Sequence, residues 1–406
     1  METTSFNHPK EQIKKILKGI EECITEDELY KKLEKSYYQK TPLRIKLGID
    51  ASGPDIHLGF AVPLRKLREF QELGHTAVLI VGDFTGMIGD PTGRSKTRPQ
   101  LTEEEIKENI KRYTQQLFKI LIPEKTEIKY NSVWLRNLTA KEIIVISSKY
   151  TVARMIERDD FSKRLKEGIP VYIHEILYPL FQGYDSIAID ADVEIGGTDQ
   201  KFNFMVAREL MREFGKEPEV IITMPLLEGT DGKMKMSKSY GNYIGIEDPP
   251  EEMFGKIMSL PDELIIKYFR LCTNLNDEEI KTIEERMKKG ENPKDFKMML
   301  AEEITKMYHS EAKALEAKKN FEKVFSRREI PEKIPVFKIK KEKNIIDVMV
   351  ESKTVNSRSE ARRLIDQGGV DVNGKKIKSI NYRFVPSETY ILKIGKRRFL
   401  KVSGEK

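Results

Sequence analysis

Residues 44–74 read RIKLGIDASGPDIHLGFAVPLRKLREFQELG. Residues 44–50 alternate apolar side chains with glycine and charge, a pattern that predicts a short buried strand. Apolar side chains then recur at helical spacing, at Leu64, Leu67, Phe70 and Leu73. Asp55 is the expected cap of this helix. A strand that passes through such a loop into a helix is where α/β sheets bind nucleotides, although an ordinary strand–loop–helix with a surface His57 has the same pattern.

A second stretch, residues 228–242, reads EGTDGKMKMSKSYGN and follows an apolar strand expected at 219–227. Its three lysines, Lys233, Lys235 and Lys238, lie on a loop bracketed by two glycines. Positive charges packed this closely repel one another unless a polyanion lies among them. The loop therefore indicates a phosphate-rich ligand.

The HLGF of residues 57–60 and the KMSKS of residues 235–239 occur in this order in two halves of the expected sheet. As a pair they resemble the signature motifs of the class I aminoacyl-tRNA synthetases. Together with further motifs, the resemblance covers nearly the whole chain and is to the tyrosyl-tRNA synthetases of the bacterial kind. These motifs are KLGIDASGPDIHLG (46–59), VGDFTGMIGDPTGRS (81–95), YPLFQGYD (178–185) and IGGTDQKFN (195–203).

Three positions depart from the pattern of that family. Phe60 stands where the family usually has the second histidine of its first signature, and Ala51 stands where it usually has proline. Lys46 stands where some members place a tyrosine that helps to read the substrate hydroxyl.

The fold class implied by the resemblance is α/β, with a Rossmann-like parallel sheet. The catalytic domain is expected at 1–245, with a connective insertion at about 134–183. A helical domain that positions tRNA is expected at 246–330, a linker at 331–342, and a small C-terminal α+β domain at 343–406. This last domain resembles the RNA-binding fold of the ribosomal-protein S-four kind. The strands expected in the large sheet are residues 44–50, 75–83, 129–133, 186–195 and 219–227.

Length and composition agree with a multi-domain protein that binds nucleic acid. The chain has 406 residues, 39% of them hydrophobic, and a net charge of +7. Residues 343–406 carry fifteen Lys/Arg against seven Asp/Glu, so the positive charge is concentrated there. Cys23 and Cys272 form no CxxC pair, so neither disulfides nor zinc are expected. We expect no membrane segment and a cytoplasmic location.

A polar stripe in YPLFQGYD predicts one wall of an amino-acid pocket. Tyr178, Gln182 and Asp185 fall at i, i+4 and i+7, one face of a helix, although a chance stripe would look the same. A pocket that bonds a phenolic hydroxyl is left with unpaired polar groups when phenylalanine enters, a selection for which tyrosyl-tRNA synthetases are the standard example. The resemblance implies that Asp185 accepts the substrate hydroxyl and that Tyr178, Gln182 and Asp90 hold its ammonium. Further tyrosine-binding residues are expected at Gly48, Asp50 and Gln200.

The resemblance also implies an ATP site and a two-step reaction. Tyrosine would attack the α-phosphorus of ATP, and the tyrosyl group would then pass to the tRNA. The catalytic candidates are His57, Lys235, Lys238 and Ser52, and Mg²⁺ would arrive with ATP. Alignment and charge stabilisation are the main demands of such phosphoryl chemistry. The expected ATP-binding residues are His57, Gly59, Gly197, Asp199, Lys235, Lys238 and Ser239.

Residues 356–377, NSRSEARRLIDQGGVDVNGKKI, predict a capped helix, a strand and a hairpin turn at Asn373-Gly374. The exposed cations are expected to bind tRNA phosphates with little base specificity. They are Arg358, Arg362, Arg363, Lys375 and Lys376. In the family, the connective insertion carries the dimer interface, so a homodimer is expected from the resemblance.

Three alternatives remain open at this point. A tryptophanyl-tRNA synthetase shares the core, although Tyr178, Gln182 and Asp185 argue against it. A nucleotidyltransferase outside translation can use a loop like HLGF but has no need for KMSKS. A non-catalytic RNA-binding protein on the same scaffold is encouraged only by Phe60.

Overall fold

The structure is a computed structural model that describes residues 6–49, 55–90, 112–326, 334–355, 357–395 and 398–404. The chain forms two compact units. One comprises Met1–Pro249 and Lys256–Ser310, and the other comprises Pro250–Gly255 and Glu311–Lys406. Among the described helices, none has the length and apolar character needed to cross a membrane.

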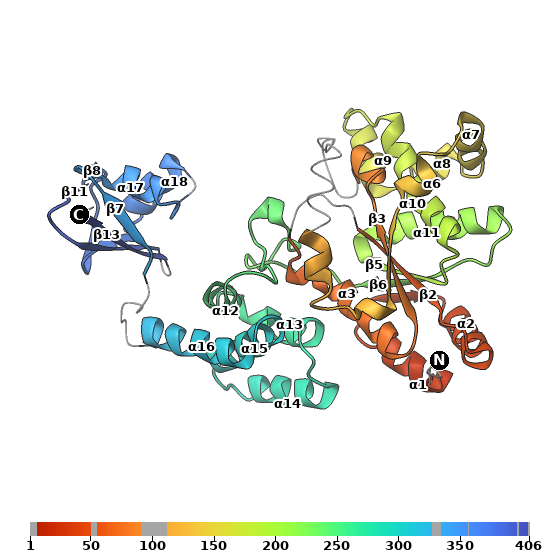
Figure 1. Ribbon diagram of the computed structural model, residues 1–406, viewed down its shortest axis with the longest axis horizontal. Coiled ribbons are helices and arrows are strands. Elements are labelled where there is room, and N and C mark those ends of the chain that lie inside the picture. Colours follow the sequence, from red (N-terminus) through yellow and green to blue (C-terminus); the bar gives the residue numbers. More distant parts are fainter. Residues whose placement is uncertain are drawn as a thin grey trace. The chain divides into compact units, whose positions relative to one another are not determined.

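The first unit is built on a six-stranded sheet of order β1-β6-β5-β2-β3-β4 (Figure 1). Five strands are parallel, and β1 pairs antiparallel with β6 at one edge. The strands are β1 (Glu22–Ile24), β2 (Arg44–Ile49), β3 (Thr76–Val81), β4 (Thr126–Tyr130), β5 (Val193–Gly197) and β6 (Val220–Met224). Strands β3, β5 and β6 are mostly buried because helices cover both faces of the sheet, whereas the edge strand β4 (sequence TEIKY) is only partly buried.

The chain winds outward from the centre of this sheet in two directions. It runs from β2 to β3 and β4, and later from β5 to β6 on the other side. Because parallel crossovers are right-handed, α3 (Leu58–Glu72) and α11 (Lys201–Glu213) lie on opposite faces. Neighbouring strands β2 and β5 thus form the switch point, where open α/β sheets bind ligands beyond the carboxyl ends of the strands.

Helix α10 (Ile173–Ile189) packs closely on α11. A Cβ at Gly183 would lie 2.9 Å from Leu210 Cδ1 and 3.0 Å from Ala207 Cα, so this crossing needs glycine. Other helices that the structure describes in the first unit include α1 (Pro9–Ile16), α2 (Glu26–Gln39), α4 (Thr85–Ile88), α6 (Ser132–Leu135), α7 (Ala140–Ser148), α8 (Val152–Met155), α9 (Asp159–Lys166), α13 (Ile265–Cys272), α14 (Asp277–Lys288) and α15 (Pro293–Tyr308).

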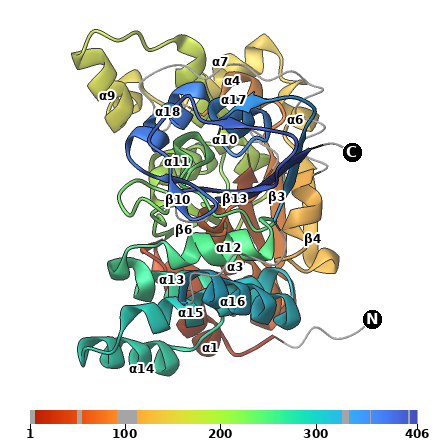
Figure 2. The ribbon, with the colours of Figure 1, turned by 90° about the vertical axis from the view of Figure 1, so that its left-hand side faces the viewer.

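The second unit contains a five-stranded sheet of order β10-β9-β12-β13-β7 and a short pair of β11 with β8. Figures 1 and 2 show α17 (Ile345–Glu351) and α18 (Arg358–Asp366) side by side. One hydrophobic cluster of this unit is formed by buried residues between Ile339 and Val402. The other elements are α12 (Pro250–Met258), which begins in this unit, α16 (Glu311–Ser326), β7 (Val336–Ile339), β8 (Lys343–Asn344), β9 (Val370–Val372), β10 (Lys375–Lys376), β11 (Arg383–Phe384), β12 (Tyr390–Ile394) and β13 (Arg398–Gly404).

Three expectations about local structure are wrong. The strand expected at 129–133 lies at Thr126–Tyr130, and α6 begins at Ser132. The strand expected at 186–195 starts only at Val193, because the apolar run at 186–189 continues α10. The cap of α3 is His57 and not Asp55, because the helix begins at Leu58 and the imidazole accepts from the Phe60 amide. The capped helix and the Asn373-Gly374 hairpin of the second unit are confirmed.

Candidate active site

His57 lies at the start of α3, where its Nδ1 accepts a hydrogen bond of 3.2 Å from the Phe60 amide. Burial lowers the pKa of His57 to about 4, and the nearby positive charge of Lys238 adds to this effect. The imidazole is therefore neutral at pH 7. Because Nδ1 accepts, the proton sits on Nε2, which can donate to an anion at this helix N-terminus.

Backbone hydrogen bonds join the histidine segment to residues just after the lysine loop, and Gly59 N donates to Met236 Sδ of the loop itself at 3.3 Å. Leu58 N donates to Ile244 O at 2.9 Å, and Ile246 N donates to Ile56 O at 2.9 Å. A Cβ at Gly59 would lie 3.2 Å from both His57 Nδ1 and Met236 Cβ, so the glycine permits this approach. Lys238 Nζ lies 3.9 Å from Asp55 Oδ2. The structure thus brings the histidine segment and the lysine segment into one site.

The lysine loop is held by Asn242, a buried residue that sequence reasoning missed. Its Oδ1 accepts from Ser237 N at 2.8 Å, and its Nδ2 donates to Asp231 Oδ2 at 3.1 Å and to Lys235 O at 3.2 Å. A Cβ at Gly229 would lie 2.3 Å from the Asn242 side chain, so the glycine makes room for this amide. In the sequence, the only indication of this role was the motif SYGN, directly after the lysines.

Lys235 and Asp199 form an ion pair of 2.6 Å between Nζ and Oδ2. Asp199 follows the carboxyl end of β5, and a Cβ at Gly197 would lie 2.6 Å from its Oδ1. Burial lowers the pKa of Lys238, with Asp55 opposing. Ser239 is exposed on the same loop. Ser52 and Asp50 lie outside the described residues.

Asp185 lies buried on α10, and each carboxylate oxygen accepts one hydrogen bond. Asn131 Nδ2 donates to Oδ2 at 3.2 Å, and Trp134 Nε1 donates to Oδ1 at 2.8 Å. Burial raises the pKa of Asp185 to about 7, opposed by Lys46 and by these two donors. Asn131 and Trp134 were not expected at the site, and the NSVW that follows β4 was the only signal for them.

Asp90 and Gln200 also meet. Gln200 Nε2 donates to Asp90 Oδ2 at 2.9 Å, and Asn203 Nδ2 donates to Gln200 Oε1 at 3.0 Å. Arg158 Nη2 lies 3.7 Å from Asp90 Oδ1. These contacts connect the first and second halves of the sheet.

The remaining pocket candidates lie on α10 and at the end of β2. Gln182 Oε1 is buried and accepts no hydrogen bond from any described residue, and Tyr178 is buried on the same helix. Gly48 lies near the end of β2, with open space around its Cα.

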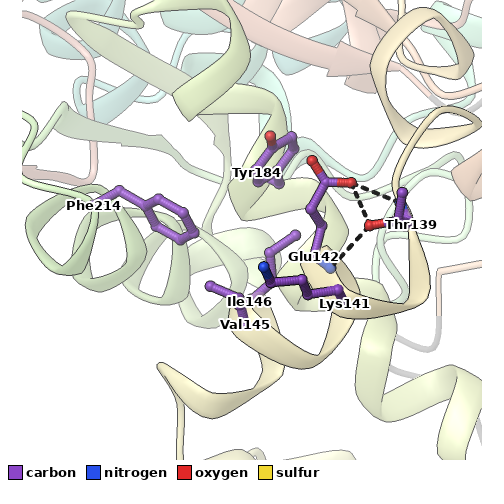
Figure 3. Close-up of a pocket in the computed structure, with 7 residues that line it drawn as sticks. All are labelled: Thr139, Lys141, Glu142, Val145, Ile146, Tyr184 and Phe214. Carbon is purple, nitrogen blue, oxygen red and sulfur yellow. Dashed lines mark hydrogen bonds between the residues drawn. The ribbon is translucent and has the colours of Figure 1, made fainter.

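No group of three or more His, Cys, Asp and Glu side chains is placed to hold a metal ion within the part of the chain that the structure describes. A surface groove between α7, α10 and the end of α11 has an apolar lining that includes Val145, Ile146 and Phe214 (Figure 3). It contains none of the candidate site residues.

The cations expected to bind RNA lie on α18 and β10. Arg362, Arg363, Lys375 and Lys376 are exposed. Arg358 is exposed as well, but its Nη1 lies 2.7 Å from Asp347 Oδ1.

Two family models match the chain. One is described as tRNA synthetases class I (W and Y) and covers residues 38–326. The other, described as the tyrosine–tRNA ligase SYY-like C-terminal domain, covers residues 327–402. A tyrosine–tRNA ligase of Thermotoga maritima is 55% identical over 397 residues, which is 98% of each chain. The chain belongs to the tyrosine–tRNA ligase family. A second ligase of the family, from Carboxydothermus hydrogenoformans, is 53% identical over 98% of each chain.

Solved structures agree with the fold of this tyrosine–tRNA ligase family. A C-terminally truncated mitochondrial tyrosyl-tRNA synthetase of Aspergillus nidulans matches with a TM-score of 0.64 and 21% identity over 78% of this chain and 94% of that one. A tyrosyl-tRNA synthetase from Archaeoglobus fulgidus, complexed with L-tyrosine, matches with a TM-score of 0.63 and 24% identity over 77% of this chain and 100% of that one. Membership in the family sets aside the tryptophanyl enzyme, the nucleotidyltransferase and the non-catalytic protein.

Proposed function

We propose that this member of the family activates L-tyrosine with ATP, releases pyrophosphate, and transfers the tyrosyl group to the 3′ end of tRNA(Tyr), in the cytoplasm. The observation that carries the residue assignment is the convergence of His57, Lys235 and Lys238 at the β2/β5 switch point. The experiment that tests the reaction is ATP–pyrophosphate exchange with each of the twenty amino acids. Tyrosine alone should support exchange.

We propose that Asp185 accepts the phenolic hydroxyl of the substrate. Each of its oxygens takes one donor from the protein, which leaves acceptor capacity for a third. Phenylalanine would leave this buried acceptor without its partner, and that loss supplies the selectivity. Gln182 Oε1, Asp90 and Tyr178 would hold the ammonium, and Gly48, Asp50 and Gln200 would complete the pocket.

For ATP, we propose that Asp199 and Gly197 contact the ribose and that His57, Gly59, Lys235, Lys238, Ser239 and Ser52 contact the phosphates. Mg²⁺ enters as part of the ATP substrate. His57 can donate from Nε2, and the two lysines supply positive charge beside it. In the first step the tyrosine carboxylate oxygen bonds to the α-phosphorus, and the bond from that phosphorus to the pyrophosphate oxygen breaks. The protein's contribution is alignment together with charge placed where negative charge accumulates.

For tRNA, we propose that residues 343–406 form the RNA-binding domain, after the linker at 331–342 and the helical domain at 246–330. Arg358, Arg362, Arg363, Lys375 and Lys376 would contact phosphates. Four of these are exposed and pair with no carboxylate among the residues that the structure describes. Arg358 would leave Asp347 and bind a phosphate instead. The affinity for tRNA that such contacts provide falls as the salt concentration rises.

Replacing Asp185 by asparagine should raise the KM for tyrosine by about a hundredfold and should cut the preference for tyrosine over phenylalanine. The amide must turn one N–H toward Asn131 or Trp134, which are themselves donors, so the pocket loses an acceptor. Pyrophosphate exchange with each amino acid measures both effects. Asp190→Asn, an exposed residue at the end of α10, is the control and should leave both values unchanged. An unchanged ratio of tyrosine to phenylalanine in Asp185→Asn would contradict the assignment.

We propose that the enzyme is a homodimer that pairs through the connective insertion. Large apolar side chains are exposed there, with Ile173 at 76%, Ile144 at 68%, Val152 at 67% and Val133 at 65%. Large apolar side chains that remain exposed on this part of the chain are candidates for burial in an interface.

A buried aspartate at such an interface costs several kcal/mol, so Ile173→Asp should weaken dimerisation by more than about a hundredfold. Light scattering behind a sizing column, run over a dilution series, measures this change. Tyr38→Asp alters a side chain that is 72% exposed on α2 and should keep the wild-type mass. A dimer that persists unchanged in Ile173→Asp would contradict this interface.

A further inference from the structure

A buried group of charged side chains lies between the large sheet and α10. Lys46 on β2 is fully buried, and its ammonium has three partners. Nζ donates to Gln182 O at 3.0 Å and to Ser186 Oγ at 2.7 Å, and it lies 2.8 Å from Glu194 Oε1. The lysine is therefore bonded to α10 on one side and to β5 on the other.

Two buried carboxyl groups lie near this ammonium. Glu194 on β5 and Glu219, next to β6, are both fully buried. Ser186 Oγ donates to Glu219 Oε1 at 3.1 Å. Burial and the charge of Glu194 raise the pKa of Glu219 well above its usual range, which favours its protonated form. Lys46 and Glu194 form the ion pair of this group.

Stability alone does not account for these charges. Taking an ion pair out of water costs several kcal/mol per ion, and apolar residues of similar volume often stabilise a fold as well or better. The position of the pair relative to the proposed pocket suggests another role. Lys46 bonds Gln182 and Ser186, and Asp185 lies between these two residues on α10.

The charged groups that face Asp185 are few. Lys46 approaches from β2 and lowers the pKa of Asp185, whereas Glu194 approaches from β5 and raises it. Glu219, whose pKa is raised, is bonded to Ser186, and Asn131 and Trp134 are uncharged donors. Asp83 lies beyond them, bound to Ser132. The positive charge of Lys46 thus opposes the effect of burial, which would otherwise favour the protonated acid.

We propose that Lys46 is a positioning residue that keeps Asp185 ionised, so that the carboxylate can accept three hydrogen bonds at once, and that Glu194 sets the strength of this effect. The inference rests on the proposed role of Asp185 in binding the substrate hydroxyl. Two of the three donors, Asn131 and Trp134, are already in place. A proton on either oxygen would face one of them or the substrate hydroxyl, so only the ionised form suits all three.

The test is the pH dependence of the tyrosine KM, measured by pyrophosphate exchange with the full-length enzyme from about pH 6 to about pH 9. In the wild type, tyrosine competes with a proton for Asp185, so KM rises as the pH falls below about 7. Lys46→Met should move this midpoint upward and raise KM at neutral pH about tenfold or more, with the difference shrinking at high pH. Glu194→Gln should move the midpoint downward, because it removes a negative charge.

The double variant Lys46→Met/Glu194→Gln removes both charges of the ion pair. Its midpoint should lie between those of Lys46→Met and the wild type, because the two lost charges have opposite effects on Asp185. It also covers the case in which Lys46→Met alone does not fold. Lys66→Met is the matched control: Lys66 is another buried lysine, on α3, and it bonds Lys18 O and Glu69 instead of α10. It should leave the midpoint unchanged.

Opposite shifts for the lysine and glutamate variants support the proposal, because a purely structural defect has no reason to follow the sign of the lost charge. Equal midpoints in the wild type and the double variant, or shifts of the same sign in Lys46→Met and Glu194→Gln, would overturn it. Asp185→Asn separates the two hypotheses. If the wild-type midpoint persists in Asp185→Asn, the proposed role of Asp185 fails. If the midpoint disappears in Asp185→Asn but is unchanged in the Lys46 variants, only the inference about Lys46 fails.

Discussion

Lys235→Ala should slow tyrosyl-adenylate formation by about a hundredfold or more while leaving tyrosine affinity nearly unchanged. The two effects differ because Lys235 and the proposed tyrosine pocket lie in different parts of the site. Lys235 Nζ contacts Asp199 on the proposed nucleotide side of the site, whereas Asp185, which we assign to the substrate hydroxyl, is bonded to Asn131 and Trp134. A charge that acts on phosphates as they separate lowers kcat when it is removed, without changing how the amino acid binds.

Single-turnover adenylate formation gives the rate, and equilibrium dialysis gives the tyrosine affinity. Lys233→Ala is the control, because it removes the same charge from an exposed position two residues away on the same loop. Its rate should stay within about threefold of the wild type. Equal losses of rate and of tyrosine affinity in Lys235→Ala would show that the lysine supports the pocket as a whole.

A chain that ends at Ser326 should keep ATP–pyrophosphate exchange and lose tRNA charging by more than about a hundredfold. The core of the C-terminal domain is drawn from residues 339–402, so its removal leaves the core of the large sheet intact. Charging, unlike exchange, needs the tRNA to be held. Aminoacylation measured beside exchange on the same preparation distinguishes the two effects.

A pair of charge variants tests the same domain without a deletion. Arg362→Gln with Arg363→Gln should raise the KM for tRNA and should flatten its dependence on salt by about one unit of slope per lost phosphate contact. Lys338→Gln with Lys401→Gln removes the same charge from β7 and β13 and should change neither quantity. Normal charging by the truncated chain, or equal effects of the two pairs, would contradict the RNA-binding assignment.

The parallel sheet followed from the sequence because local signals specify its strands, whereas the meeting of the two signature segments was expected from their resemblance to the family. The apolar runs at Thr76–Val81 and Val220–Met224 are strands that are covered on both faces, and such strands have few alternatives. The Asn373-Gly374 turn was equally clear, because both residues have positive φ, which few other pairs adopt readily.

Other features could not be read from the chain because they depend on contacts between distant residues. The apolar residues at 186–189 fit a strand or a helix equally well, and packing of α10 on α11 decides for the helix. Asn131, Trp134 and Asn242 bond partners that lie 5 to 54 residues away along the chain. Lys46 stood out as a departure from the family, but its partners Glu194 and Ser186 come from other elements.

The ion pair of Lys235 with Asp199 has one more consequence. These residues are assigned to opposite ends of the nucleotide, yet the protein makes each the counter-ion of the other, at 2.6 Å. On this assignment, ATP binding is a swap of partners that replaces the contact between Lys235 and Asp199. The ribose hydroxyls then bind the aspartate, and the phosphates bind the ammonium. Such a swap leaves each of the two side chains with a hydrogen-bonding partner, and a nucleoside that lacks phosphates can satisfy only one half of it.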